Sequence, residues 1–278
     1  MKDILTRAIT GALFVALIIG ALWWSVNASI FVMTLFLVLG LIEYFNLFKN
    51  SELVNVSMPI AVSGALVVFL CLMIPLIDGL HYSFSLLPML LFPFIFILFL
   101  TELWRKKANP LLNIGVMSFS IFYLVIPFMF IILLSRMSSH ENPLVIGMFL
   151  LIWTNDTFAY LSGRLMGKTK LFERISPKKT WEGTIGGIIF TIGVAYLLGL
   201  WGTEYSSTFW MISALIIAPC AILGDLLESL FKRSLNIKDS GTILPGHGGI
   251  LDRFDATIFA VPFFYSWTMF YNFLQTNV

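Results

Sequence analysis

Residues 207–230 read STFWMISALIIAPCAILGDLLESL, an apolar run that is long enough to cross a membrane and ends in charged side chains. A helix needs about 20 apolar residues to cross the hydrocarbon layer, and only helices or closed barrels can do so. Further apolar stretches flank this one, without the period-two alternation of a transmembrane strand. The nine expected spans are 8–24, 28–48, 58–78, 85–104, 113–135, 143–163, 183–202, 207–230 and 253–274. The sequence therefore predicts an all-α polytopic bundle of about nine transmembrane helices.

Composition indicates the same class of protein. Of the 278 residues, 59% are hydrophobic and 12% are charged, whereas soluble domains carry about 25% charged residues. A soluble fold of this length cannot bury so much apolar surface in one core, so the water-soluble classes are excluded. The first apolar run, Ala8–Trp24, is longer than the roughly 7–15 residues of a signal-peptide core, which predicts an uncleaved first span.

Basic residues orient the predicted bundle. The chain has 17 Lys and Arg residues, of which 16 fall in alternate connections on one side and only Arg136 falls on the other. Cytoplasmic loops retain Lys and Arg, so the N-terminus is expected in the cytoplasm and the C-terminus on the far side. The longest cytoplasmic connections are 164–182 and 231–252. We expect an N-terminal part, 1–110, with about four spans and a C-terminal part, 111–278, with about five spans and both charged loops.

The first group of polar residues ends the 207–230 span. Asp225, Glu228, Ser229 and Lys232 are spaced i, i+3, i+4 and i+7, which places them on one face of a helix. Ionisable side chains near membrane depth are costly and usually face the bundle interior or a wet cavity. One interpretation is a site for a charged ligand. The other is a set of ion pairs between the two carboxylates and Lys232 that merely ends the span.

The second group lies between this span and the last one. Gly246, Gly248 and Gly249 allow backbone N–H groups to converge on an anion. Asp252 and Asp255 share one face at the start of the next helix, where carboxylates can also act as simple caps. Carboxylates beside a glycine-rich turn supply oxygen ligands for Mg²⁺ and N–H donors for phosphates. We therefore favour a site for magnesium and a polyphosphate.

Two further expectations follow from this segment. The spans 207–230 and 253–274 are sequence neighbours, so Asp225 and Asp252 could reach a common metal ion from adjacent helices. His247 lies among the glycines and could be a general base, a metal ligand or a hydrogen-bond donor to phosphate. A donor or positioning role fits it better than zinc binding, because no partner ligands have suitable spacing.

A third group lies between the sixth and seventh spans. Asn155 and Asp156 come near the end of 143–163, and the later segment Ser176–Gly183 contains Lys178 and Lys179. The lysine pair fits electrostatic binding of phosphate or of anionic lipid headgroups. A cytoplasmic loop would nevertheless carry lysines in any case.

The run from Ser229 to Asp255, SLFKRSLNIKDSGTILPGHGGILDRFD, resembles the signature of the phosphatidate cytidylyltransferases, also called CDP-diacylglycerol synthases. Ser176–Gly183 resembles the second characteristic segment of that family. The resemblance implies transfer of CMP from CTP to phosphatidic acid, which gives CDP-diacylglycerol and pyrophosphate with Mg²⁺. It makes Asp225 and Asp252 candidate metal ligands, and it implies a K⁺ ion beside the divalent metal, with ligands that the sequence does not assign.

The implied chemistry agrees with these residues. A phosphomonoester has a second pKa of about 6, so the lipid phosphate is already anionic at neutral pH and needs no strong base. The enzyme must instead neutralise charge and align the reactants. The candidate catalytic residues are Asp225, Asp252, Lys232, Arg233 and His247. The candidate substrate-binding residues are Lys178, Lys179, Thr180, Ser229, Lys238, Asp239, Gly246, Gly248, Gly249 and Arg253. The candidate metal ligands are Asp225, Asp252, Glu228 and Asp255.

The expected partners are CTP, phosphatidic acid and the lipid bilayer, with no nucleic acid and with a homodimer as one option. The expected location is a cell inner membrane, with the site facing the cytoplasm. A CTP-dependent lipid kinase is the nearest alternative, and it would need a base such as His247 for a lipid hydroxyl. A cation transporter that uses Asp156, Asp225 and Asp252 is disfavoured, because the far-side loops are nearly featureless.

Overall fold

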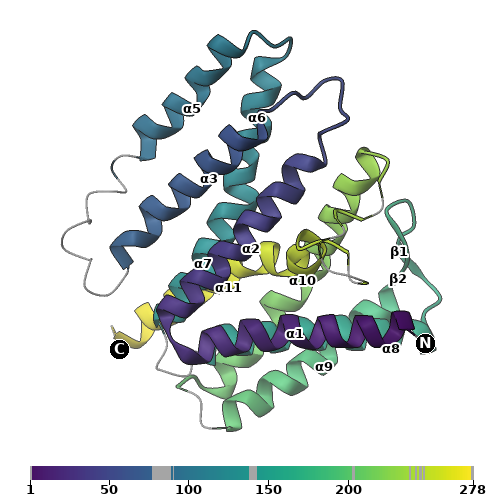
Figure 1. The fold of residues 1–278 in the computed structure, drawn as a ribbon. Coiled ribbons are helices and arrows are strands. Elements are labelled where there is room, and N and C mark those ends of the chain that lie inside the picture. The colour runs from purple at the N-terminus through teal and green to yellow at the C-terminus, as the bar shows by residue number, and fades with distance from the viewer. Residues whose placement is uncertain are drawn as a thin grey trace. The chain divides into compact units, whose positions relative to one another are not determined.

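The structure is a computed structural model that describes residues 2–76, 89, 91–137, 143–201, 204–237, 239–241, 243, 246 and 248–276 (Figure 1). Two compact units divide the chain. The first unit contains Met1–Ile132 together with Ser240–Leu251, and the second contains Leu133–Asp239 together with Asp252–Val278. The chain therefore leaves the second unit after Asp239, belongs to the first unit over Ser240–Leu251, and returns to the second at Asp252.

The first unit is built from apolar helices that pack in sequence order. Its helices are α1 (Lys2–Trp24), α2 (Val26–Asn46), α3 (Met58–Met73), a 3-10 turn at Ile74–Leu76, α5 (Leu91–Arg105), and α6 (Pro110–Ser120), which continues through a π-helical turn at Ile121–Val125 into α7 (Ile126–Met137). The last residues of α7, from Leu133 on, belong to the second unit. Helices α1 and α2, α2 and α3, α3 and α5, and α5 and α6 are in contact. The Tyr44 hydroxyl of α2 donates a hydrogen bond of 3.1 Å to the Val116 carbonyl of α6.

The second unit combines long helices with one small hairpin. Its elements are α8 (Pro143–Met166), β1 (Lys170–Phe172), β2 (Ser176–Thr180), α9 (Trp181–Leu200), α10 (Ser207–Ser234) and α11 (Leu251–Thr276). The two strands pair antiparallel, with Lys170 opposite Thr180 and Phe172 opposite Ser176. The hairpin connects α8 to α9, and these two helices form the most extensive packing in the unit.

Local sequence explains where several helices begin. The Ser25 hydroxyl accepts the Ala28 N–H at the start of α2, and the Ser206 hydroxyl accepts the Phe209 N–H at the start of α10. Short hydroxyl side chains at this position satisfy an N–H group that has no partner within the helix. Proline, which needs no N–H donor there, is the first residue of α6 and α8.

Small residues let α8 and α9 approach closely. A methyl group on Gly183 would lie 2.7 Å from the Ala159 carbonyl oxygen and 3.0 Å from the Gly163 Cα atom. A methyl group on Gly187 would lie 2.9 Å from the Ala159 Cβ atom. Membrane helices associate through such contacts because lipid supplies no hydrophobic drive for larger side chains. The close packing fixes the hairpin at one end of the helix pair.

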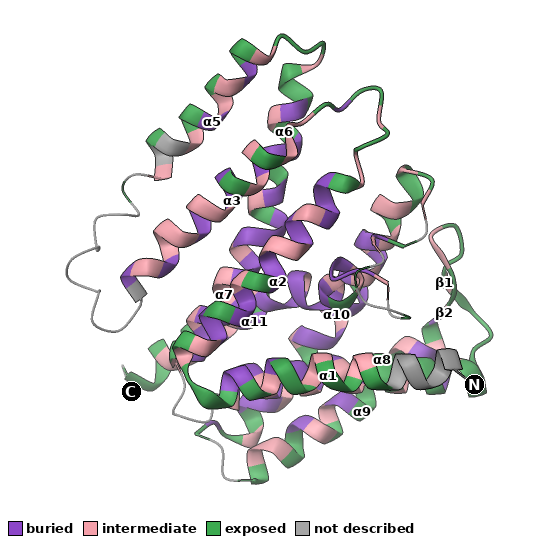
Figure 2. Ribbon diagram, viewed as in Figure 1, coloured by how far each residue is buried: buried purple, intermediate pink, exposed green. Residues whose placement is uncertain are grey.

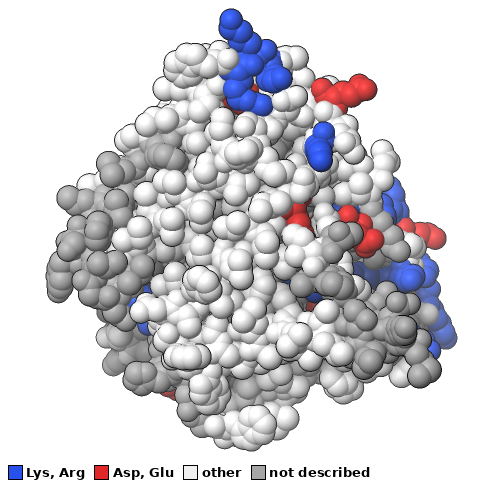
Figure 3. Space-filling model, viewed as in Figure 1, with Lys and Arg blue, Asp and Glu red and all other residues white. Residues whose placement is uncertain are grey.

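The structure confirms a helical, membrane-type protein. Within the described residues, five helices are long and apolar enough to cross a membrane, namely Val26–Asn46, Pro110–Met137, Pro143–Met166, Trp181–Leu200 and Ser207–Ser234. Figure 2 shows exposed positions along many of the helices. Large apolar side chains occupy many of these positions, including Phe31 (72% exposed), Trp104 (75%) and Phe122 (69%). Most of the described surface in Figure 3 carries neither basic nor acidic side chains. Such exposure suits contact with lipid, since soluble surfaces avoid extended apolar patches.

Each predicted span contains a helix in its described part, although parts of 58–78, 85–104 and 183–202 lie outside the described residues. A span count of nine stays a prediction. The β1–β2 hairpin was not expected, because the loop 164–182 was predicted without strands. Its second strand reads Ser-Pro-Lys-Lys-Thr, which lacks the apolar alternation that indicates a strand.

Candidate active site

Helices α10 and α11 meet at a glycine beside the predicted carboxylates. A methyl group on Gly224 would lie 2.6 Å from the Asp255 carbonyl oxygen and 2.8 Å from the Phe259 Cβ atom. Further along, Phe209 stacks on Trp267 with ring centroids 5.9 Å apart. The packing confirms that these two helices, neighbours in sequence, are also neighbours in space. It brings the ends that carry Asp225 and Asp252 into one region.

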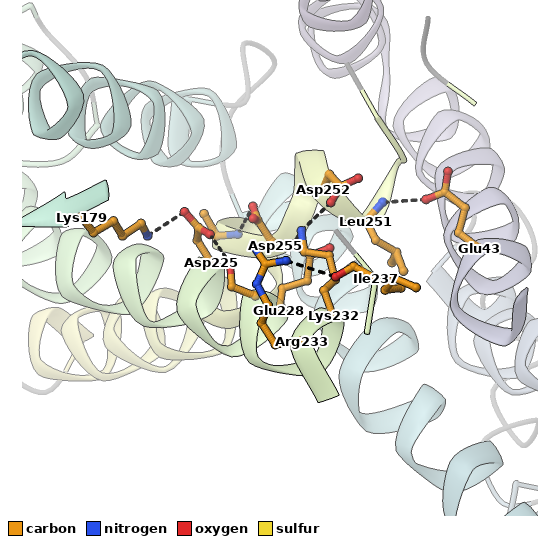
Figure 4. A network of polar contacts seen from close by, with 12 residues as sticks. Glu43, Lys179, Asp225, Glu228, Lys232, Arg233, Ile237, Leu251, Asp252 and Asp255 are labelled. Atoms are coloured by element: carbon orange, nitrogen blue, oxygen red, sulfur yellow. Dashed lines mark hydrogen bonds and ion pairs between the residues drawn. The ribbon is translucent and has the colours of Figure 1, made fainter. Parts of the chain in front are cut away.

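Lys232 joins two carboxylates from different helices (Figure 4). Its Nζ atom lies 2.8 Å from Glu228 Oε2 on α10 and 2.6 Å from Asp252 Oδ1 on α11. The three side chains are nearly buried, with exposed fractions of 12% for Lys232, 5% for Glu228 and 8% for Asp252. Removing one partner from such a set leaves an uncompensated buried charge. The predicted ion pair between Glu228 and Lys232 within α10 is therefore present, and Lys232 also pairs with Asp252 of α11.

Lys179 makes a second and more exposed bridge. Its Nζ atom lies 2.6 Å from Asp225 Oδ2, and the side chains are 26% and 38% exposed. The other oxygen of Asp225 accepts a hydrogen bond of 3.3 Å from the Ser229 hydroxyl. Lys178 precedes Lys179 on strand β2, and successive strand side chains point to opposite faces. The two lysines therefore differ: Lys179 faces Asp225, whereas Lys178 is exposed.

Two more carboxylates extend this cluster. Asp255 of α11 interacts electrostatically with Glu228, Asp225 and Asp156. Asp156 of α8 interacts electrostatically with Asp225, and with the cations of Lys179 and Arg253. Asp156 is part of the Asn-Asp pair that the sequence places near the end of 143–163, but it is not among the predicted site residues. An ionisable residue near the end of an apolar span is the sequence feature that could have indicated its place in the site.

We name this group the carboxylate cluster, and it lies within the second unit. Its acidic members are Asp156, Asp225, Glu228, Asp252 and Asp255, and its basic members are Lys179, Lys232 and Arg253. The acids outnumber the bases. Among the described residues, Glu228 Oε1 is buried and has no hydrogen-bond partner. A surplus of acids and a buried oxygen without a partner suit a site that takes up a cation.

Three other predicted site residues, Thr180, Arg233 and Asp239, are described in the structure. The Thr180 hydroxyl accepts the Gly183 N–H at 3.2 Å, so it caps α9. Arg233 Nη1 donates to the Ile237 carbonyl at 3.3 Å, which turns this guanidinium toward the end of its own helix. Asp239 is exposed. Their predicted roles toward substrate stay predictions.

The glycine-rich segment belongs to the first unit. Gly246 and Gly248 have φ angles of 77° and 82°, a left-handed conformation that favours glycine. Gly249 is buried, and a methyl group on it would lie 2.5 Å from Glu43 Oε2. The Ser240 hydroxyl oxygen would be equally close, so two protein side chains occupy the space that a side chain at Gly249 would need. His247 and Lys238 lie outside the described residues.

The side-chain types of the cluster suit a divalent cation, but their positions in this structure do not form a metal site. Carboxylate oxygens are the ligands that Mg²⁺ prefers. Within the described ranges, however, no three Asp, Glu, His or Cys side chains lie close enough together to hold a metal ion. Lys179 and Lys232 instead contact Asp225, Glu228 and Asp252. The predicted metal ligands are therefore near one another, with lysines as their present counterions.

The fold and the cluster together define a helical membrane-type protein with a charged site at the ends of α10 and α11. Comparison with known proteins adds the family. Residues 5–271 match the model of the cytidylyltransferase family, which is most of the chain. The chain therefore belongs to the cytidylyltransferase family.

Individual relatives share long segments with the chain. A phosphatidate cytidylyltransferase of Haemophilus influenzae is 39% identical over 175 residues, which are 59% of this chain and 58% of the relative. One of Staphylococcus saprophyticus is 41% identical over 169 residues, 60% of this chain and 64% of the relative. One of Staphylococcus haemolyticus is 50% identical over 116 residues, 41% of this chain and 44% of the relative. The chain thus matches less than two thirds of the length of these relatives.

Proposed function

We propose that this protein transfers CMP from CTP to phosphatidic acid and releases pyrophosphate. The observation that carries the proposal is the family match over residues 5–271, which contains the whole carboxylate cluster. The relatives bear the name phosphatidate cytidylyltransferase, which supports the same lipid substrate here. The exposed apolar side chains also support a lipid substrate, whose acyl chains can stay in the bilayer.

In the proposed reaction, an oxygen of the lipid phosphate attacks the α-phosphorus of CTP. The new P–O bond forms as the bond to the β-phosphate breaks, so the products are CDP-diacylglycerol and pyrophosphate. The nucleophile is an anion at neutral pH, and a strong general base is not needed. The protein's task is to bring two polyanions together and to stabilise negative charge that moves onto the leaving group.

The basic residues of the cluster suit that task. Lys232 lies between two acids and can exchange a carboxylate for a substrate phosphate without a change in its own charge. Lys179 is partly exposed at the hairpin and is available to a lipid phosphate arriving from the membrane surface. We assign Lys179 to the lipid phosphate and Lys232 to the triphosphate. Arg233, Lys238, His247 and Arg253 stay candidates for the same charge-neutralising role.

We further propose Mg²⁺ as the cofactor, held by carboxylates of α10 and α11. Asp225 and Asp252 are the first candidates as ligands, with Glu228 and Asp255 as additional ones. The ion would neutralise charge on the triphosphate when bound. The acid surplus and the buried Glu228 Oε1 support a cation in this place. K⁺ is a further candidate, without assigned ligands.

The metal assignment predicts a specific loss. Asp252→Asn keeps the shape of the side chain but removes one negative charge and weakens cation binding. We expect Mg²⁺-dependent turnover to fall by about 100-fold or more, with the variant still inserted and folded. Glu173→Gln, at the exposed turn of the hairpin, is the matched control and should retain activity. Turnover by Asp252→Asn at the wild-type rate would remove Asp252 from the metal site.

We place the cluster at the cytoplasmic face of a bacterial inner membrane, in a chain of nine spans with its C-terminus on the far side. The excess of Lys and Arg in alternate connections supports this orientation. The division into an N-terminal part, 1–110, and a catalytic part, 111–278, belongs to the same proposal. A homodimer is its simplest oligomeric form.

Incubation with two forms of labelled CTP tests the proposed reaction. Cytosine label should enter the lipid fraction, and γ-phosphate label should leave as pyrophosphate. A CTP-dependent lipid kinase would give the opposite pattern, with γ-phosphate in lipid and cytosine label in soluble CDP. That second pattern would overturn the proposal.

A further inference from the structure

Glu43 is a buried carboxylate of α2 that contacts both ends of the glycine-rich segment. Its side chain is 2% exposed. Its Oε2 atom accepts the Leu251 N–H at 3.0 Å, across 208 positions of sequence (Figure 4). A methyl group on Gly249 would lie 2.5 Å from Glu43 Oε2, and one on Gly241 would lie 2.5 Å from Glu43 Oε1. Gly241, Gly249 and Leu251 therefore all lie beside one carboxylate.

The location of this carboxylate argues against a passive role. An ionisable side chain within an apolar helix is costly and is retained only where it makes specific contacts. Leu251 is the first residue of α11, where N–H groups lack partners within the helix and favour a negative charge. The residue that follows Leu251 is Asp252, a predicted metal ligand. Glu43 thus fixes the backbone immediately before a residue of the carboxylate cluster.

We propose that Glu43 is a positioning residue that holds Gly241, Gly249 and the Leu251 N–H, and with them the backbone next to Asp252, in the place used when the triphosphate binds. This inference rests on the proposed function. The Glu43 carboxylate occupies the Leu251 N–H, so a substrate phosphate cannot use that donor. Gly241 makes room for Glu43, and Gly249 makes room for both Glu43 and the Ser240 hydroxyl.

A double-substitution cycle tests the contact itself. The three atoms nearest to a methyl group on Gly241 all belong to Glu43, and the φ angle of Gly241 is not in the left-handed region. Gly241→Ala should therefore lower the thermal stability of the wild-type protein. In the Glu43→Ala background, the same substitution should not lower thermal stability any further. An equal cost in both backgrounds would show that Glu43 does not confine the segment.

Hydrogen–deuterium exchange tests the positioning without any assay of activity. In Glu43→Ala, amide exchange should increase in peptides covering 239–252, and Glu43→Gln, which keeps an acceptor oxygen, should restore part of the protection. Glu52→Gln, an exposed acid in the same unit, is the control and should leave exchange unchanged. Wild-type exchange in 239–252 of the Glu43→Ala variant would overturn the proposal.

Kinetics then connect the position to the reaction. Misplacement by about 1 Å can cost about 100-fold in rate, so we expect kcat/KM for CTP to fall by about 10–100-fold in Glu43→Ala. The KM for phosphatidate should not change, and Glu43→Gln should be more active than Glu43→Ala. Equal losses for both substrates would contradict a role at the triphosphate. A wild-type protein without cytidylyl transfer would refute the proposed function, whereas the exchange experiment would still decide the role of Glu43.

Discussion

Two polar networks of this protein, each with buried carboxylates, differ in charge balance. In the first unit, Glu102 pairs with Arg105 and accepts a hydrogen bond of 2.9 Å from Asn113. Asn113 in turn accepts the Asn55 N–H at 2.8 Å, and Arg105 donates to the Asn55 carbonyl at 2.6 Å. One acid, Glu102, pairs with one base, Arg105, and Asn55 and Asn113 supply the other hydrogen-bonding groups. This network ties the loop before α3 to α5 and α6.

The carboxylate cluster of the second unit is different. Five acids share three bases, and the buried Glu228 Oε1 has no hydrogen-bond partner among the described residues. A balanced and saturated network stabilises a fold and has little capacity for a ligand. An unbalanced one keeps negative charge that a cation can neutralise. From this difference we propose a structural role for the network of Glu102 and a functional role for the carboxylate cluster, although both are built from ordinary ion pairs.

The largest effect on stability is expected from Lys232→Met. The substitution leaves Glu228 and Asp252 facing each other without their shared cation, which should lower the free energy of unfolding by about 3–5 kcal/mol. Denaturant unfolding in nanodiscs measures it, with the exposed Lys168→Met as the control. Added Mg²⁺ should stabilise Lys232→Met more than the wild type. If Mg²⁺ has the same effect on both proteins, the cluster is not a cation site of the kind described.

Glu102→Gln tests the balanced network and should have an intermediate effect. Glutamine keeps an acceptor for Asn113 but loses the charge that pairs with Arg105, so we expect a loss of about 1–3 kcal/mol in stability. Activity per folded molecule should not change, because the network takes up no ligand. Unfolding curves and kcat, each compared with Glu52→Gln, measure the two quantities. A fall in kcat with unchanged stability would make this network functional as well.

The smallest effect on stability is expected at the hairpin. Lys179→Ala and Lys178→Ala should each change stability by about 1 kcal/mol or less, because partly exposed ion pairs contribute little. Their effects on catalysis should differ, since only Lys179 faces Asp225. We expect Lys179→Ala to raise the KM for phosphatidate more than Lys178→Ala does, in assays with mixed micelles. Equal changes would mean that the lysines act only through the general charge of the loop.

Much of the site was predictable because it rests on local spacing. The positions of Asp225, Glu228, Ser229 and Lys232 at i, i+3, i+4 and i+7 predict one helix face, and the structure has Ser229 on Asp225 and Lys232 on Glu228. The close approach of α10 and α11 follows from their being sequence neighbours. Glu43 was not predicted, since a single acid within an apolar run gives no indication of which distant segment it contacts.

The sequence by itself determined the helical membrane class, the family and the helix face that carries the cluster. Hydrophobic length, charge spacing and a contiguous signature are local properties, so they need no knowledge of how segments pack. Only the tertiary structure decided which cation faces which acid, and why Gly224, Gly241 and Gly249 have no side chain. These features depend on contacts made in the folded chain: the backbone of α11 leaves no room for a methyl group on Gly224, and the Glu43 side chain of α2 occupies the space beside Gly241 and Gly249.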